Sequence, residues 1–165
     1  MEMANVPTRR AITSRSEFHE AVRSALGQAA DAGASEIWLC DATFADWPLG
    51  ERTVIEDLAR WVAPLRHLTL LAHRFEEIAR RHGRWSEWRR SWAHLVECRS
   101  NPELEAAQFP SICLVPGVIS VQLFDPLAHR GLASHQPADE MACREAIDAV
   151  LQRSAEAFPV TTLGL

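Results

Sequence analysis

Three short apolar runs, each preceded by a stretch of helical periodicity, constrain the fold of this chain more than any other feature. The runs are EIWLCD (36–41), HLTLLAH (67–73) and LVECRS (95–100). Each is bounded by polar residues and has the length of a buried strand. Helix-spaced apolar residues precede the runs, at 14–32, 51–62 and 74–94. Alternating helices and strands favour right-handed crossovers and parallel strands covered by helices.

The second half of the chain predicts a hairpin and a closing helix. SICLVPGVISVQLFD (111–125) is typical of two strands around a Pro-Gly turn, and 138–154 has an amphipathic pattern. The expected fold class is therefore α/β, with a mixed, mainly parallel sheet flanked by helices in one domain over 14–165. Residues 1–13 lack periodicity, so we expect a flexible N-terminal segment. The apolar ending FPVTTLGL (158–165) is expected to dock on the domain or on a partner.

Composition and charge exclude several classes of function. The net charge is -5, whereas domains that bind nucleic acid generally are usually basic, so nucleic acid is not an expected partner. All 17 basic residues are arginine, which excludes a Walker loop and any lysine-based catalysis. Without a signal-peptide pattern or an apolar stretch of about 20 residues, we expect a cytoplasmic protein that does not span a membrane.

The cysteines and histidines do not form a recognisable metal motif. The four cysteines form no CxxC pair, and three of them lie in apolar runs, which predicts buried free thiols. No pair of histidines has the spacing of metal ligands. We therefore expect no metal site and no cofactor. The cysteines are Cys40, Cys98, Cys113 and Cys143.

The segment HGRWSEWRRSW (82–92) combines three tryptophans with three arginines. On one helix over 74–94, the tryptophans fall within a wide apolar arc, which predicts that they face the core. Trp92, together with Trp38 of the first strand, is expected to be largely buried. Arg81 and Arg89 fall within the same arc. A guanidinium in that position needs a carboxylate, backbone carbonyls or a phosphate, and we expect pairing with carboxylates, with anion binding as the alternative.

Polar residues follow each of the three predicted parallel strands. Asp41 ends the first, His73 and Arg74 follow the second, and Arg99 ends the third. Ligands in open α/β sheets bind beyond the carboxyl ends of the strands. We therefore take Asp41, His73, Arg74 and Arg99, together with Arg89, as candidate ligand-binding residues. None of them is assigned a catalytic role.

The order of these elements resembles a single phospholipase D-like domain over residues 14–155. The resemblance implies a phospholipase D-like fold in a bacterial protein. The catalytic signature of that family is His-x-Lys-x4-Asp near the hairpin, where the histidine forms the phospho-enzyme and the lysine neutralises charge. The corresponding stretch here, SICLVPGVISVQLFD, has neither His nor Lys. The resemblance therefore implies a catalytically inactive member.

Three functions follow from these observations. The first is a non-catalytic binding or scaffold domain that takes a small anion or a protein partner, with a homodimer as one arrangement. The second is a hydrolase or phosphoesterase that uses Asp41, His73 and Arg99. The third is contact with nucleic acid through the arginine-rich helix 74–94.

Overall fold

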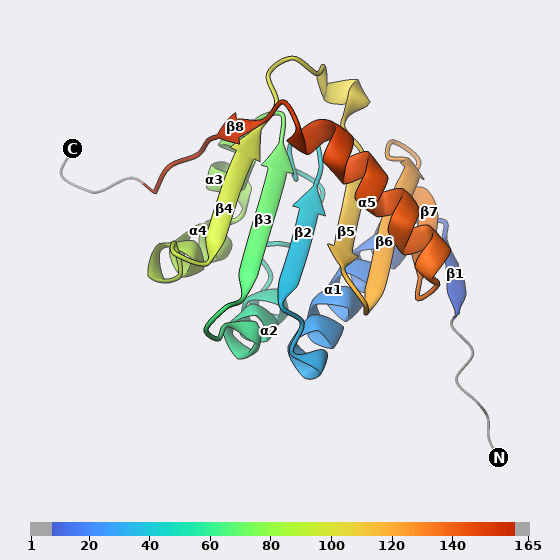
Figure 1. Cartoon of the computed structure of the whole chain (residues 1–165), viewed down its shortest axis with the longest axis horizontal. Helices are drawn as coiled ribbons and strands as arrows, with labels where there is room; N and C mark the ends of the chain where they lie inside the picture. The colour runs from blue at the N-terminus through green and yellow to red at the C-terminus, as the bar shows by residue number, and fades with distance from the viewer. Residues whose placement is uncertain (1–7, 161–165) are drawn as a thin grey trace.

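One continuous sheet of eight strands organises residues 8–160, the part of the chain that this computed structural model describes (Figure 1). The strand order across the sheet is β1-β7-β6-β5-β2-β3-β4-β8. The strands are β1 (Arg9–Ile12), β2 (Glu36–Cys40), β3 (His67–Ala72), β4 (Val96–Ser100), β5 (Ser111–Val115), β6 (Ile119–Asp125), β7 (Arg130–Ser134) and β8 (Ala155–Glu156).

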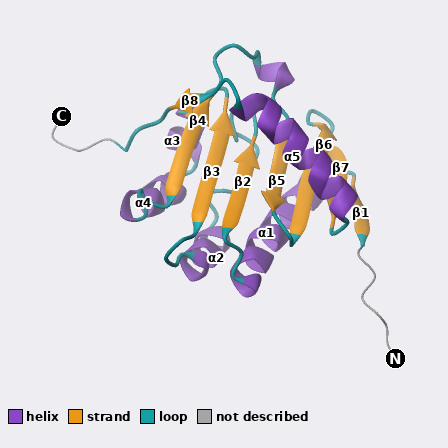
Figure 2. Cartoon of the chain, in the orientation of Figure 1, coloured by secondary structure: helices purple, strands orange, loops and turns teal. Residues whose placement is uncertain are grey.

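Helices cover both faces of this sheet. Four of them lie behind the sheet in the view of Figure 1, and α5 crosses the front over β5 and β6 (Figures 1 and 2). The helices are α1 (Arg15–Ala32), α2 (Arg52–Trp61), α3 (Glu76–Arg81), α4 (Gly83–Ser91) and α5 (Pro137–Leu151). Helix α1 is capped at both ends by residues that adjoin it in the sequence. Ser14 accepts a hydrogen bond from the Glu17 N–H at 3.1 Å, and Gly33 ends the helix at φ 65°.

The strand directions correct one prediction. Within the described residues, β2–β3 and β3–β4 are parallel, and the other five neighbouring pairs are antiparallel. The mixed α/β class is confirmed, but "mainly parallel" is wrong. The helical crossovers do make β2, β3 and β4 parallel, as expected. The hairpin and three strands that the sequence pattern did not reveal make the rest of the sheet antiparallel.

The three unpredicted strands lie at or near the edges of the sheet. One of them, β1, falls within 1–13, so the prediction of a flexible segment is wrong for Arg9–Ile12, while residues 1–7 lie outside the described residues. Strand β1 is held in place by its pairing with β7 and by two hydrogen bonds from the Arg9 guanidinium to the Asp139 carboxylate. The same Arg9 contact, with a hydrogen bond from Ser134, lowers the pKa of Asp139 to about 2.

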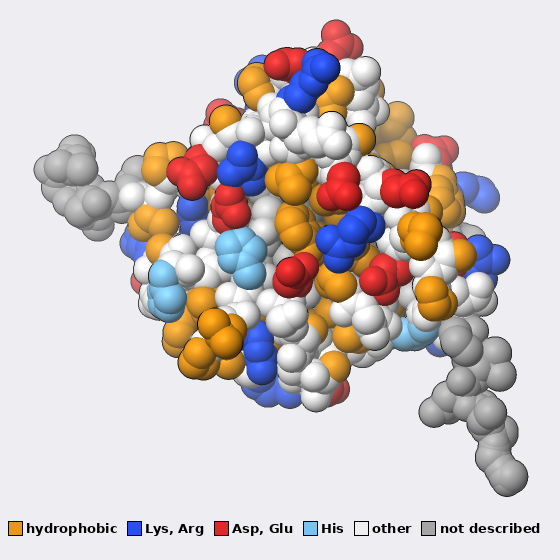
Figure 3. Space-filling view, in the orientation of Figure 1, with side chains coloured by type: hydrophobic (Ala, Val, Ile, Leu, Met, Phe, Trp, Pro, Cys, Tyr) orange, Lys and Arg blue, Asp and Glu red, His pale blue; other side chains and the backbone are white. Residues whose placement is uncertain are grey.

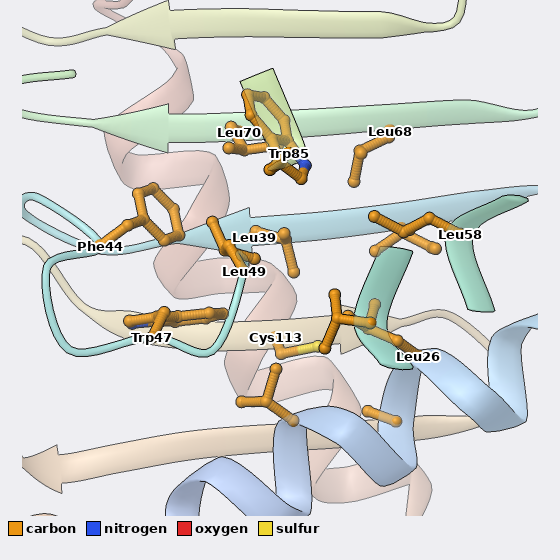
Figure 4. Close-up of a cluster of buried hydrophobic side chains, with 14 of the residues drawn as sticks. Leu26, Leu39, Phe44, Trp47, Leu49, Leu58, Leu68, Leu70, Trp85 and Cys113 are labelled. Carbon is orange, nitrogen blue, oxygen red and sulfur yellow. The ribbon is translucent and has the colours of Figure 1, made fainter. Parts of the chain in front are cut away.

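The main core lies between the sheet and α1, α2 and α4 (Figure 4). Its largest fully buried side chains include Trp61 and Trp85, and Trp47 is 3% exposed. A smaller core under α5 contains Leu71, Ile112 and Leu114. Trp38 and Trp92, predicted to be largely buried, are only partly buried at the margins of these cores. Trp38 lies on the α5 face of its strand, and α5 covers that face incompletely.

The predicted helix over 74–94 is two helices, α3 and α4, joined at His82. This residue leaves the helical conformation (φ −122°, ψ 60°), and its Nε2 lies 2.8 Å from the Phe44 carbonyl oxygen. The break shifts the helical phase between the two halves. Arg81 is therefore exposed, and its Nε donates to Glu77 at 2.7 Å on the same helix. The predicted carboxylate partner of Arg81 is confirmed, although its place in an apolar arc is wrong.

The cysteine and tail predictions are confirmed where the structure describes them. All four cysteines are free and buried, and burial raises the pKa of Cys143 to about 11. The segment 155–160, which we call the strap, lies along β4 and α4, while 161–165 lies outside the described residues. Phe158 of the strap stacks on Phe75 with ring centroids 5.1 Å apart. No helix within 8–160 is both long and apolar enough to span a membrane.

Candidate functional site

A cleft of about 450 Å³ opens at the carboxyl ends of β2 and β6, beside the start of β5. We call it the strand-end cleft. It lies where ligands bind in open α/β sheets, and its volume suits a small organic ligand. Four aromatic residues line it, with three aspartates and one histidine among the other lining residues. These eight residues are Phe18, Trp47, Phe109, Phe124, Asp41, Asp46, Asp125 and His129.

Asp41 is the predicted site residue that the cleft contains. Its Oδ2 accepts hydrogen bonds from the N–H groups of Thr43 (3.2 Å) and Phe44 (2.8 Å), and its Oδ1 accepts one from the Ser111 hydroxyl. The carboxylate therefore folds the loop after β2 back on itself and ties it to β5. Its hydrogen-bonding capacity is largely used by the protein, so Asp41 shapes the wall of the cleft.

The loop after β2 is held in place by side chains from other elements. His19 of α1 bonds the carbonyl of Asp46, His82 bonds that of Phe44, and Arg84 donates to that of Gly50 at 3.0 Å. Phe44 adopts φ 61°, a left-handed conformation that is uncommon for a bulky residue. These contacts give the cleft a preformed wall.

The cleft is acidic at its rim. Asp46 lies 3.6 Å from Arg15 and 3.8 Å from His129, both loose contacts of an exposed carboxylate. Asp125 accepts a hydrogen bond from the Ala128 N–H at 3.3 Å. Among the described residues, no arginine lines this cleft. Leu127, next to these groups, is 97% exposed. Aromatic walls with a negative rim favour a ligand that is apolar and positively charged.

His73 and Arg74 lie in a different hollow, of about 360 Å³, bounded by α3 and the strap. The ring of His73 packs edge-on against Phe109 at 5.8 Å, and its Nδ1 is buried without a partner in the described residues. No hydrogen bond joins His73 to Asp41 or to Arg99 within 8–160. These strand ends are neighbours in the sheet, but their side chains do not converge on one point.

Arg99 is held by its own neighbours. Its guanidinium donates to Glu97 at 2.6 Å and to the hydroxyl and carbonyl of Ser154 at 2.7 and 2.9 Å. The same contact with Arg99 lowers the pKa of Glu97. These bonds attach the segment between α5 and β8 to β4. Arg99 therefore joins secondary-structure elements rather than facing the strand-end cleft.

Arg89 is the one arginine of the described residues that is buried. It is 7% exposed, its Nε has no hydrogen-bond partner, and within 8–160 no carboxylate lies within ion-pair distance. Its guanidinium carbon lies 4.8 Å from the centre of the Phe158 ring. The prediction of a carboxylate partner for Arg89 is therefore wrong. The side chain borders two hollows beside the strap, of about 550 and 170 Å³.

The sequence did not single out several residues that shape these hollows. Phe109, Phe124 and His129 come from segments that carry no motif, and Ser86 lies between two tryptophans. Within 8–160, no group of three or more His, Cys, Asp or Glu is arranged to hold a metal ion.

Comparison with known proteins identifies structures of similar fold. No protein-family model matches the chain, and no curated protein matches it by sequence. Among solved structures, it is similar to NucT from Helicobacter pylori (TM-score 0.58, 8% identity) and to Nuc from Salmonella typhimurium, a phospholipase D family member (0.58, 11%). These matches cover 92% and 93% of this chain and 100% of each other chain.

A third similar structure is that of TrmBL2, an archaeal chromatin protein described as having a novel mode of DNA binding. Its TM-score is 0.61 at 11% identity, and the match covers 91% of this chain. The chain spans about half the length of that protein, since 55% of it is covered. At these identities the likeness concerns the fold alone, and the fold is phospholipase D-like.

Proposed function

We propose that this chain is a non-catalytic binding domain with a phospholipase D-like fold, and that its ligand occupies the strand-end cleft. The lining of the cleft carries this proposal, because four aromatic residues and three aspartates surround a hollow of about 450 Å³ with no arginine. A small apolar molecule with one positive charge fits that chemistry. This replaces the expectation of an anion beside Asp41.

The absence of catalysis is the first testable consequence. We expect pure protein to show no turnover of a generic phosphodiester such as bis(4-nitrophenyl) phosphate, because the His and Lys of the family signature are missing. Asp41, His73 and Arg99 also make no mutual hydrogen bond in the described residues. A colorimetric assay of wild type and His73→Ala checks this. Turnover that is present in wild type and lost in His73→Ala would support the phosphoesterase alternative instead.

The second testable consequence concerns the charge of the ligand. We expect 2-phenylethylammonium to bind, measured by calorimetry or ligand-observed NMR, and the similarly shaped anion 3-phenylpropionate not to bind. Asp125→Asn keeps the oxygen that accepts from Ala128 and removes the charge. This variant should weaken the binding of the ammonium about 2- to 5-fold, since one exposed charge contributes up to about 1 kcal/mol.

The control variant is Asp148→Asn, which removes an exposed carboxylate from α5 outside the cleft. It should leave the dissociation constant of the ammonium unchanged. Equal binding of both probes, or binding of neither, would contradict the proposed ligand class.

Contact with nucleic acid is a second candidate. Arg80, Arg84 and Arg90 are all exposed on the α3–α4 segment, and one protein of similar fold is described as binding DNA. The net charge of -5 argued against nucleic acid, but a local group of arginines does not depend on the net charge. Figure 3 views the α5 face, where acidic and basic side chains lie among hydrophobic ones, so that face has no comparable basic character.

A further inference from the structure

Helix α4 buries four polar side-chain atoms that have no hydrogen-bond partner within 8–160. They are the indole nitrogens of Trp85 and Trp88, the Ser86 hydroxyl and the Arg89 Nε. Buried polar atoms are nearly always paired, so such a group calls for an explanation. Ser86 and Arg89 are three residues apart and therefore lie on the same side of the helix. Both residues line the side of α4 that faces the strap.

Ser86 and Arg89 share a cavity of about 170 Å³, which we call the α4 cavity. Arg90 and Ala79 also line it, and Phe158, Pro159 and Val160 of the strap close its far side. No acidic residue of the described chain lines the cavity. Its volume is several times the roughly 30 Å³ that a water molecule occupies in the liquid. It therefore has room for a small polyatomic anion.

Phe158 fixes the guanidinium of Arg89 in this position. The ring stacks on Phe75 at an interplanar angle of 13°, and the guanidinium carbon of Arg89 lies 4.8 Å from the ring centre. The backbone of Phe158 is at φ 50°, an unfavourable conformation for a non-glycine residue that its packing maintains. A guanidinium stacked on a ring keeps its N–H donors free at the edge. Arg89 is thus oriented for a planar or tetrahedral oxyanion.

The acidic residues nearby line the larger hollow, which Arg89 also borders. Glu97 and Glu156 line that hollow together with His67 and His94. Glu97 already bonds Arg99 at 2.6 Å and lies 3.2 Å from His67. Glu156 is exposed. Neither forms an ion pair with Arg89, so the charge of Arg89 is not neutralised within the described chain.

We propose that the α4 cavity binds the oxyanion of a phosphate group. The Ser86 hydroxyl and the Arg89 guanidinium donate to it, and Arg90 adds a positive charge at the edge. A buried guanidinium without a counter-ion is costly, and hydrogen bonds from a guanidinium to phosphate are among the strong ones. This site does not depend on the strand-end cleft. The phosphate is either a free anion or part of a nucleic-acid backbone.

Titration with inorganic phosphate tests the site. At ionic strength matched with sodium chloride, phosphate should raise the Tm of wild type in a saturable manner. Calorimetry should give a dissociation constant that increases about tenfold or more in Arg89→Met and about threefold or more in Ser86→Ala. Ser86→Ala leaves the Phe158 stack intact, so it tests the site even if Arg89→Met folds poorly. The control Arg52→Ala removes an exposed arginine of α2 and should change nothing.

A short single-stranded DNA distinguishes the two sources of phosphate. If the DNA competes with inorganic phosphate, and the same two variants weaken its binding, the site takes a backbone phosphate. If phosphate alone binds, the ligand is a free anion. No stabilisation beyond that given by chloride, or equal affinity for phosphate in wild type and both variants, overturns the proposal. Failure of the ammonium probe at the strand-end cleft would leave this result unaffected.

Discussion

Replacing Trp61 with alanine should lower the free energy of unfolding by about 3–5 kcal/mol, the usual cost of truncating a buried tryptophan. Trp61 is the last residue of α2 and is fully buried. Its indole N–H donates to the Ala34 carbonyl oxygen at 2.7 Å, which ties α2 to the turn between α1 and β2. The alanine variant loses the packing and also leaves that buried carbonyl without its donor. Urea denaturation followed by circular dichroism measures the change.

Two further variants separate packing from hydrogen bonding. Trp61→Phe retains most of the buried ring and should cost about 1–3 kcal/mol, chiefly from the lost hydrogen bond. Trp92→Ala removes a partly buried tryptophan and should cost less than Trp61→Ala. Equal losses for Trp61→Ala and Trp92→Ala would mean that the core is not centred where the structure places it.

The parallel centre of the sheet was predictable from the sequence because its strands are apolar runs, and the middle strand, β3, is buried on both faces. A strand of this kind is a continuous apolar run, as in β3, where every residue after His67 is buried. The amphipathic helices between the runs then determine the crossovers. The resemblance to a phospholipase D-like domain rested on this order of elements, and it agrees with the solved structures of similar fold.

The edges of the sheet were not predictable in this way. The strand β1 has the sequence RRAI with a single buried residue, and β8 consists of two exposed residues. Neither segment buries enough apolar surface to produce a period of two. They are strands because a neighbouring strand offers unpaired backbone groups, and that information is not local.

The roles of the site residues depend on the direction of their side chains, which the sequence did not determine. The rule that ligands bind at strand ends did place Asp41 at a cleft. It did not foresee that Asp41 would bond its own loop, or that Arg99 would bond Ser154. In α4, the break at His82 changed the helical phase, so Arg81 is exposed and Arg89 alone remains buried.

Replacing Gly131 with alanine should lower the free energy of unfolding by about 3 kcal/mol or more and should also disturb the strand-end cleft. A Cβ at this position of β7 would lie 1.9 Å from the Gln122 carbonyl oxygen and 2.7 Å from the Leu123 Cα. Those atoms belong to the backbone of β6, which has no rotamer with which to move aside. The close approach lies where the β6–β7 pairing shifts register between Leu123 and Asp125.

The strain should therefore reach the cleft, whose wall includes Leu123, Phe124 and Asp125. We expect Gly131→Ala to weaken the binding of 2-phenylethylammonium. It should also speed hydrogen exchange in β1, because Gly131 is the partner of Ile12. Gly83→Ala is the matched control, since a Cβ there meets nothing within 4 Å. That variant should change stability by no more than about 1 kcal/mol. If Gly131→Ala proves as stable as Gly83→Ala, the two strands are not packed as closely as the structure shows, and the cleft that they help to form loses its rigid wall.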